Sequence, residues 1–313
     1  MSHKYSHHKS NHTFSSWLQA SRPPSQLYIF PPLLLGQLFA VQGGYPFSWS
    51  IFIICHLYGL ACQLYIVFAN DAADVVTDKR NNTYTIFSGG SRVLVEDKIS
   101  WQVLMSAAAG AAFVCVIMGF ILGLWYERWA PLVLISLGII LLWAYSYPPV
   151  RMSYRGGGEI LQMLGLGILL PLTGFSAQSG DIVDFPWVVT IPLMFLALTC
   201  AMSTALPDEP SDRISNKRTT AVFLRVHNSQ KIIMGLNLTA IALIVFLPIP
   251  GFNIVHKAGI AFISLLIWTY GLQLRSCLPG TNCLSKFVAL MVGFSLWPLV
   301  AMNLILLYLY SMS

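Results

Sequence analysis

The chain has 313 residues, of which 56% are hydrophobic and only 10% charged, and its mean hydropathy is +0.67. A soluble domain of this length does not need so much apolar surface, so the composition excludes an ordinary globular protein and predicts an all-α, polytopic membrane protein. The apolar segments are too long for the roughly ten-residue alternating strands of an outer-membrane barrel. The net charge of +6 is explained below by membrane topology, and we expect no nucleic-acid partner.

Residues 1–22 are polar and rich in histidine, and we predict that they form a disordered cytoplasmic tail. A His-rich tract of this kind can also bind metal, so that alternative stays open. Residues 23–313 are predicted to form one transmembrane domain, capped on its cytoplasmic side by loops 71–100 and 207–230.

Nine apolar runs are candidates for membrane spans, since a spanning helix needs about 20 predominantly apolar residues. They cover approximately residues 27–42, 46–70, 101–124, 129–147, 158–178, 186–206, 231–248, 257–275 and 287–310. The first run is short and contains Pro31 and Pro32, which we expect to kink it, because proline removes a helical hydrogen bond.

The basic residues are distributed unequally between the two sides of the membrane that these runs define. Of the 18 Lys and Arg residues, 16 lie on the side of the N-terminus, and only Arg128 and Lys257 lie on the other. The positive-inside rule therefore places the N-terminus and the longer loops in the cytoplasm, and the C-terminus outside. We expect an integral, multi-pass protein of a bacterial-type inner membrane.

Six cysteines are present, most of them inside the apolar runs. Cys277 and Cys283 share one loop, but no further pair of His or Cys residues completes a zinc-binding spacing. We interpret all six as structural and predict no disulfide.

Three aspartates, Asp71, Asp74 and Asp78, follow the second apolar run directly. If the helix continues through them, Asn70, Asp74 and Asp78 share one face and Asp71 lies on its flank. Such a cluster repels itself at neutral pH unless a cation lies among the carboxylates. Mg²⁺ suits one or two carboxylates together with the phosphate oxygens of a substrate. The alternative is a solvated acidic helix end, balanced by basic neighbours such as Arg80.

A second acidic segment, with Asp208 and Asp212, follows the sixth run and precedes Lys217 and Arg218. It could be a plain interfacial turn in which Asp208 caps a short helix. However, two segments in which acids precede bases lie on the same side of the membrane, and this favours a shared binding site over a plain turn. In such a site the carboxylates bind a metal, the metal binds a diphosphate, and Lys or Arg neutralises the remaining phosphate oxygens. A diphosphate with an apolar tail would suit this place.

The stretch 145–159 between the two acidic segments reads YSYPPVRMSYRGGGE. Its prolines end the fourth run, and its glycines allow close backbone approach. Tyr147 and Arg151 could face the same mouth, or could belong to an aromatic and basic belt at the membrane interface.

These features together resemble the UbiA superfamily of intramembrane aromatic prenyltransferases. The resemblance rests on the NDxxDxxxD pattern at Asn70–Asp78, the DxxxD pattern at Asp208–Asp212, and the stretch 145–159. Within the superfamily the chain is most similar to the MenA-like branch, the 1,4-dihydroxy-2-naphthoate polyprenyltransferases of menaquinone synthesis. Asp78 follows Asp74 by four residues, a spacing more similar to the 4-hydroxybenzoate branch, so the acceptor stays open.

The resemblance implies nine helices around a central cavity that opens to the cytoplasm. It also implies Mg²⁺-dependent transfer of a prenyl chain from an isoprenyl diphosphate to an aromatic acceptor, with membrane lipid around the protein. The expected metal ligands are Asp71, Asp74, Asp78, Asp208 and Asp212. The expected catalytic residues are Asp71, Asp74, Asp208 and Tyr147, and the expected substrate-binding residues are Asn70, Arg22, Arg80, Arg151, Lys217 and Arg218.

Three alternatives remain at this stage. A prenyltransferase could use a different acceptor, either similar to 4-hydroxybenzoate or a lipid. A CDP-alcohol phosphotransferase also clusters aspartates at a cytoplasmic mouth, but its characteristic pattern is absent. A cation-coupled transporter would place ionisable residues near the membrane midplane, whereas here the acids lie at the ends of the runs.

Overall fold

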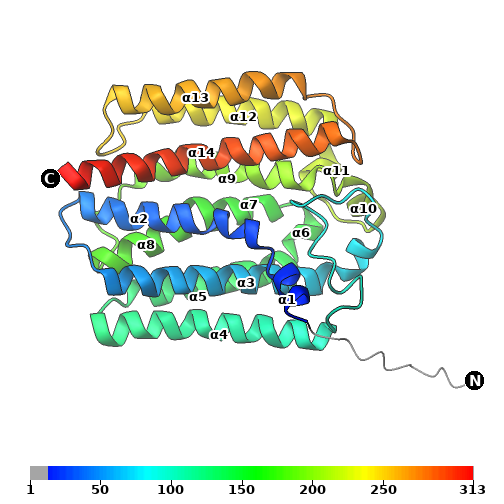
Figure 1. The fold of residues 1–313 in the computed structure, drawn as a ribbon, viewed down its shortest axis with the longest axis horizontal. Helices are drawn as coiled ribbons and strands as arrows, with labels where there is room; N and C mark the ends of the chain where they lie inside the picture. Colours follow the sequence, from blue (N-terminus) through cyan, green and yellow to red (C-terminus); the bar gives the residue numbers. More distant parts are fainter. Residues whose placement is uncertain (1–12, 313) are drawn as a thin grey trace, which may run out of the picture.

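The computed structural model describes residues 13–312, and within this range it is helical with no β-strand, as the composition predicts (Figure 1). Long helices lie side by side in one bundle. They are α2 (Phe30–Gln42), α3 (Trp49–Lys79), α4 (Trp101–Tyr126), α5 (Ala130–Ser146), α9 (Thr190–Ala205), α12 (Val226–Phe246), α13 (Ile254–Gln273) and α14 (Asn282–Met312). A further rod is formed without a break by α7 (Gly158–Leu164), the π-helical turn η2 (Gly165–Leu169) and α8 (Leu170–Ser179).

Each of the nine predicted apolar runs coincides with a helix or part of one. In the described range, seven helical segments are long and apolar enough to cross a membrane, which supports an integral multi-pass protein. Helix α5 is apolar but has 17 residues, and α2 has 13. Length and composition therefore support seven spans, and the predicted number of nine is not confirmed.

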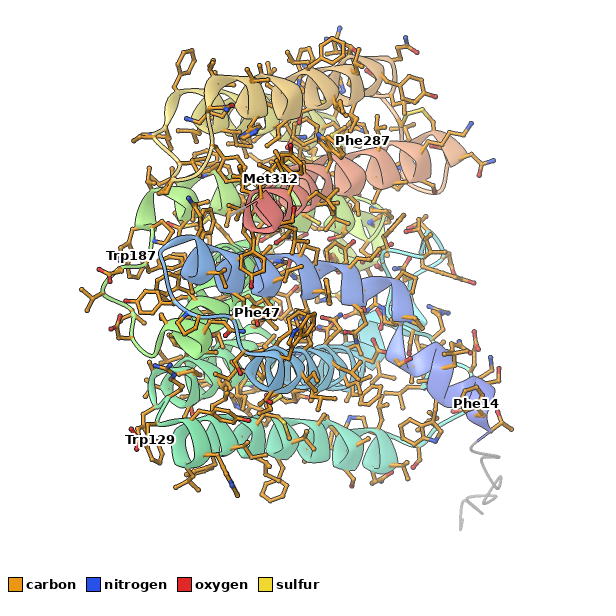
Figure 2. The ribbon with its side chains drawn as sticks, turned by 60° about the vertical axis from the view of Figure 1, so that its left-hand side comes forward. Phe14, Phe47, Trp129, Trp187, Phe287 and Met312 are labelled. Atoms are coloured by element: carbon orange, nitrogen blue, oxygen red, sulfur yellow. A yellow bond between two sulfur atoms is a disulfide. The ribbon has the colours of Figure 1, made fainter. Side chains whose placement is uncertain are left out.

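The short elements gather at one end of the bundle. Figure 1 shows α1, α6, α10, α11 and the long loop before α4 at the end near the N-terminus, while the C-terminus lies at the other end. Their bounds are α1 Phe14–Ser21, η1 Pro23–Tyr28, α6 Met152–Arg155, α10 Glu209–Ile214 and α11 Thr220–Leu224. The 3₁₀ turn η3 (Trp187–Val189) precedes α9 at the opposite end, where Figure 2 places Trp129 and Trp187, far from Phe14.

The predicted disordered tail is partly wrong. Residues 1–12 lie outside the described residues, but Phe14–Ser21 form helix α1. Trp17 packs edge-on against Phe68 of α3, and the Gln19 side chain donates to the carbonyl oxygen of Ser91 at 2.7 Å. A helix of eight residues that depends on such contacts carries no long apolar run, so the sequence pattern did not reveal it.

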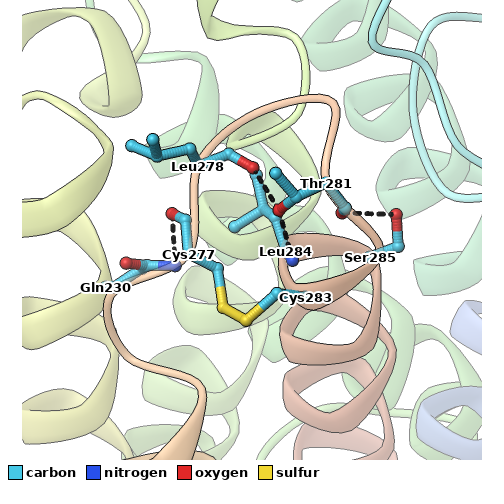
Figure 3. The surroundings of a disulfide bond; sticks show 7 residues. All are labelled: Gln230, Cys277, Leu278, Thr281, Cys283, Leu284 and Ser285. Carbon is cyan, nitrogen blue, oxygen red and sulfur yellow. Dashed lines mark hydrogen bonds between the residues drawn. A yellow bond between two sulfur atoms is a disulfide. The ribbon is translucent and has the colours of Figure 1, made fainter.

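The prediction that no disulfide forms is also wrong. Cys277 and Cys283 are bonded across the loop between α13 and α14, with their Cα atoms 5.5 Å apart (Figure 3). The turn between them contains Gly280 at a φ of +78°, which reverses the chain and brings the two cysteines together. The side chain of Gln230 on α12 donates to the Cys277 carbonyl oxygen at 3.3 Å and ties this loop to the bundle.

Helices α2 and α8 touch through their backbones. A Cβ atom added to Gly174 would overlap the carbonyl oxygen of Leu33, and one added to Gly36 would overlap the carbonyl oxygen of Pro171. Small residues at such a crossing let helices approach closely, which is how helices associate in membranes without a hydrophobic driving force. This contact holds α2 beside the rod that carries one wall of the site described below.

We expect Gly174→Val to destabilise the bundle, because its side chain would force α2 and α8 apart. Overpacking of this kind costs about 3 kcal/mol. Thermal unfolding of the purified protein in detergent measures the effect. Gly259→Val on α13 is the matched control, since a Cβ there meets no atom within 4 Å. Equal melting temperatures for the two variants would contradict the backbone contact.

Candidate active site

A cavity of about 270 Å³ opens between α3, α5, α7 and α9. Its charged end contains Asp74, Asp78, Asp208, Asp212 and Lys217. The remaining wall is mostly apolar and includes Ile29, Ile66, Val67, Leu141, Leu142, Leu161, Leu166, Leu169 and Leu170. The cavity is therefore suited to an amphipathic ligand with a polar head and an apolar tail.

Helix α3 continues through the first acidic motif to Lys79, so the condition for a shared face is met, and it presents Asn70, Asp74 and Asp78 to the cavity. Asp71 lies on the flank and is not part of the cavity wall. Its carboxylate accepts hydrogen bonds from the backbone and the hydroxyl group of Ser91, and lies 3.7 Å from the guanidinium of Arg22.

Lys217 joins the two acidic motifs. Its Nζ atom lies 2.7 Å from Asp74 Oδ2 and 3.8 Å from Asp212 Oδ1, and all three side chains are buried. Two segments more than a hundred residues apart thus meet at one charged end. Burial opposes the charge on Lys217, but the neighbouring aspartates outweigh it and hold the pKa of Lys217 well above its usual value.

The acids of the second motif lie outside the spanning helices and have raised pKa values. Burial raises the pKa of Asp212 to about 7, against the opposing effect of Lys217. Burial likewise raises the pKa of Asp208, although the Asn81 side chain, whose Nδ2 lies 2.7 Å from Asp208 Oδ1, favours the ionised form. A cation brought to this end would lower both pKa values.

The loop after α3 lies over these acids. Besides Asn81, the backbone N–H of Gly89 donates to Asp208 Oδ2 at 3.1 Å. Gly90 follows with a φ of +70°, and a Cβ there would overlap the carboxylate of Asp78. Glycine at this position therefore permits both the left-handed turn and the close approach of backbone to carboxylate.

Tyr154 on α6 holds Asp74 in place by a hydrogen bond. Its hydroxyl donates to Asp74 Oδ1 at 3.1 Å and lies 3.1 Å from the hydroxyl of Thr77. The guanidinium of Arg151 stacks over the Tyr154 ring, 3.6 Å from its centroid. Arg151 therefore contacts the Tyr154 ring and does not line the cavity. Sequence reasoning missed Tyr154, although it lies in the stretch that carried the resemblance.

The structure does not bring Tyr147, a predicted catalytic residue, to the cavity. Its hydroxyl donates to the carbonyl oxygen of Ala69 at 2.8 Å, and its ring stacks on Trp143. The physical reason is that α5 ends at Ser146, so the backbone of Tyr147 is extended and its side chain turns toward α3 and α4. Tyr145 lines the cavity instead, one turn after the wall residue Leu141 on the same helix face.

The predicted substrate-binding residues divide into two groups. Asn70, Arg22 and Lys217 line the cavity. Arg80 ends α3 as an exposed residue, and Arg218 is exposed beside a shallow second pocket on the outer side of Lys217. These two arginines, like Arg151, do not form part of the main cavity wall.

In residues 13–312 no group of three or more His, Cys, Asp or Glu side chains is close enough to hold a metal ion by itself. The charged end nevertheless offers four carboxylates, two from each motif, and Lys217 pairs with one of each, Asp74 and Asp212. Mg²⁺ commonly uses one or two carboxylates and completes its shell with water and substrate phosphates. The residues present therefore fit a metal that shares its ligands with a phosphate group.

The fold and the site define an α-helical membrane protein with an acid-lined cavity at one end of its bundle. Residues 29–283 match the model of the UbiA prenyltransferase family, and the chain belongs to this family. It is also similar to a 2-carboxy-1,4-naphthoquinone phytyltransferase of Synechocystis sp., with 28% identity over 191 residues. That match spans 59% of this chain and 57% of the relative.

Solved structures share the fold. A UbiA homolog from Aeropyrum pernix matches with a TM-score of 0.67 at 16% identity, covering 89% of this chain and 98% of that one. A UbiA homolog from Archaeoglobus fulgidus bound to GPP and Mg²⁺ matches with a TM-score of 0.67 at 17% identity, covering 92% and 99%. At these identities the likeness establishes the arrangement of helices.

We expect Lys217→Met to lower the melting temperature strongly at pH 8, because it leaves two buried carboxylates facing each other without a cation. Removing one partner of a buried ion pair costs about 3–5 kcal/mol. The loss should shrink at pH 6: without Lys217, which lowers it, the pKa of Asp212 lies above about 7, so Asp212 is protonated at pH 6 and the repulsion falls.

Thermal unfolding in metal-free detergent solution at both pH values tests this expectation. Lys286→Met, an exposed lysine at the start of α14, is the control. An equal loss of stability at pH 6 and pH 8 would show that Lys217 does not balance the charge of these aspartates.

Proposed function

We propose that the protein transfers a prenyl chain from an isoprenyl diphosphate to an aromatic acceptor in a Mg²⁺-dependent reaction. The observation that carries this proposal is the junction at Lys217, where Asp74 and Asp212 meet at the charged end of a cavity whose other wall is apolar. The diphosphate would lie at the charged end and the isoprenoid tail along the leucine-rich wall. Family membership supports the same reaction class.

Asp74, Asp78, Asp208 and Asp212 would hold the metal, which when bound stabilises negative charge on the diphosphate. Lys217 can donate to a phosphate oxygen from the same side, and the Asn70 amide, 3.1 Å from Asp74 Oδ2, orients that carboxylate. These groups act where charge develops as the allylic C–O bond breaks, and fixed dipoles and charges in a water-poor site are effective there.

Aromatic rings on the cavity wall would stabilise the positive charge that grows on the prenyl carbon. Tyr28 and Tyr145 line the cavity. The faces of such rings attract a cation, so they would shelter an allylic cation from water until the acceptor attacks. The loop after α3 and the segment α10–α11 cover the charged end and would exclude water, which otherwise produces prenyl alcohol.

The acceptor we propose is 1,4-dihydroxy-2-naphthoate, which would place the protein in menaquinone synthesis. The MenA-like motifs and the naphthoquinone named as substrate of the Synechocystis relative support this choice. An acceptor similar to 4-hydroxybenzoate, or a lipid, is the second candidate, because of the spacing between Asp74 and Asp78. Mass spectrometry of products from a panel of acceptors distinguishes them.

We further propose that all nine apolar helices lie within the membrane and that the charged mouth faces the cytoplasm. The excess of Lys and Arg at the end with α6, α10 and α11 supports this orientation. The exposed Trp129 and Trp187 at the opposite end suit the outer interface (Figure 2). A transporter is disfavoured because the aspartates of the cavity cluster at one end of the bundle rather than at mid-height.

We expect Asp74→Asn and Asp208→Asn each to lower prenyl transfer by about a thousandfold, because the isosteric amide removes a metal-binding charge. Diphosphate release from proteoliposomes given geranyl diphosphate and acceptor measures the rate. The control is Asp97→Asn, an exposed residue on the same side whose left-handed φ of 52° suits asparagine. Wild-type rates in either cavity variant would refute the assignment.

Removal of the metal provides an independent test of the diphosphate site. We expect excess EDTA to stop turnover and added Mg²⁺ to restore it, because four carboxylates beside a diphosphate repel it unless a divalent cation lies between them. Turnover that persists in excess chelator, with free metal verified as absent, would rule out the metal–diphosphate arrangement.

A further inference from the structure

One carboxylate on the cavity wall belongs to neither aspartate motif. Glu159 is the second residue of α7, lines the cavity, and is only 6% exposed. None of the ion pairs in residues 13–312 involves it. A buried carboxylate is costly unless it is paired or hydrogen-bonded, so its remaining bonding capacity points to a partner that the protein does not supply.

The two oxygens of Glu159 have different surroundings. Oε1 accepts hydrogen bonds from the backbone N–H and the hydroxyl of Thr220, at 2.8 and 2.9 Å, which fix the carboxylate against α11. Oε2 accepts no hydrogen bond from the described residues, and it is not among the buried polar atoms that are sealed from solvent. Oε2 therefore keeps accessible surface, on a residue that lines the cavity.

Tyr145 and Gln162 complete a polar patch on this wall. Gln162 is three residues after Glu159 on the same helix face, and its Nε2 lies 3.3 Å from the Tyr145 hydroxyl oxygen. The Tyr145 hydroxyl accepts this bond, and its own hydrogen is not donated to any protein group in the described range. The patch therefore offers a fixed acceptor, Oε2, and an unused donor, the Tyr145 hydroxyl.

The patch lies in the same cavity as the proposed diphosphate end. Tyr145 and Glu159 line it together with Asp74 and Lys217. The ring of Tyr145 packs beside Gly158, where an added Cβ would lie 2.8 Å from Cε2, and this contact fixes the ring next to Glu159. A flat ligand that contacts both Glu159 and Tyr145 would therefore share this cavity with the prenyl chain.

We propose that Glu159, with Tyr145, forms the subsite for a hydroxyaromatic acceptor; this inference rests on the function proposed above. Glu159 Oε2 accepts a hydrogen bond from an aromatic hydroxyl, and Tyr145 donates to a second oxygen of the same acceptor. An ionised carboxylate can only accept hydrogen bonds, so the subsite selects a hydroxyarene and rejects the corresponding methyl ether.

The same contact gives Glu159 a catalytic role. As the ring carbon bonds to the prenyl carbon, the C–O bond to the diphosphate breaks and its electron pair leaves with the diphosphate. The hydroxyl proton passes to Glu159 Oε2, which leaves a ketone in the ring. The ring carbon then loses its own substituent, either as carbon dioxide or as a proton that the released diphosphate takes up. The electron pair of the broken bond restores the aromatic ring, and the proton on Glu159 returns to the ring oxygen as the hydroxyl.

The test compares wild type with Glu159→Gln, using 1,4-dihydroxy-2-naphthoate and geranyl diphosphate in proteoliposomes. We expect kcat to fall and the KM for the acceptor to rise about tenfold, because a hydrogen bond to a charged group is lost, while the KM for geranyl diphosphate stays within about twofold. The methyl ether of the acceptor, used as a competitive inhibitor, should bind relatively better to Glu159→Gln, since the amide can donate to the ether oxygen. Glu159→Asp should restore part of the lost activity.

The test also needs a control variant and a second variant of the subsite. Glu127→Gln, the same change at an exposed residue that ends α4 at the opposite end of the bundle, should behave as wild type. Tyr145→Phe removes only a hydroxyl and should raise the KM for the acceptor alone, which tests the subsite even if Glu159→Gln does not fold.

The outcomes separate this inference from the function on which it rests. If wild type forms no prenylated product with any acceptor, the proposed function is wrong and the subsite falls with it. If wild type is active, but neither variant changes the KM for the acceptor or the preference for hydroxyl over ether, the subsite is wrong and the proposed function stands.

Discussion

The ion pairs that Lys217 makes with Asp74 and Asp212 are the contacts on which the rest of the site depends. Asp74 lies on α3 and Asp212 on α10, so one ammonium group joins the early and late parts of the chain at one mouth. Without that cation, several carboxylates would lie together in a buried place, which electrostatics strongly disfavours. A metal ion bound by these carboxylates would balance their charge in place of Lys217, which would leave Lys217 free to contact the diphosphate.

The loop after α3 also connects the two acidic motifs, because it makes hydrogen bonds to an aspartate of each. The loop after α3 supplies Asn81 and Gly89 to Asp208 of the second motif, while Ser91 from the same loop holds Asp71 of the first. Asp208 and Asp71 therefore keep a defined orientation before any ligand arrives. Preorganised groups of this kind need little rearrangement when charge develops on a leaving group, which is how electrostatic catalysis is achieved.

The cavity also separates three chemical tasks along its wall. In the proposed reaction the aspartates and Lys217 would hold the metal and the diphosphate, the leucine-rich wall would accommodate an apolar tail, and Glu159 with Tyr145 would hydrogen-bond to the acceptor ring; all of these residues line the cavity. The close contact of α2 and α8 at Gly36 and Gly174 keeps the surrounding helices packed while leaving this space open. Asp74, Asp78, Tyr145 and Glu159 are carried by helices, whereas Asp208 and Lys217 lie in the segments that flank α10.

The sequence by itself determined the helical membrane class, the acidic face of α3 and the pairing of two acid-and-base segments, because helical spacing and charge asymmetry are local properties. It could not determine that Tyr147 turns away while Tyr145 faces the cavity, because that depends on where α5 ends. Helix α1 and the Cys277–Cys283 disulfide likewise depend on contacts between distant or reversed segments. Only the tertiary structure decided which polar groups meet, because the partner of each buried charge lies far away along the chain.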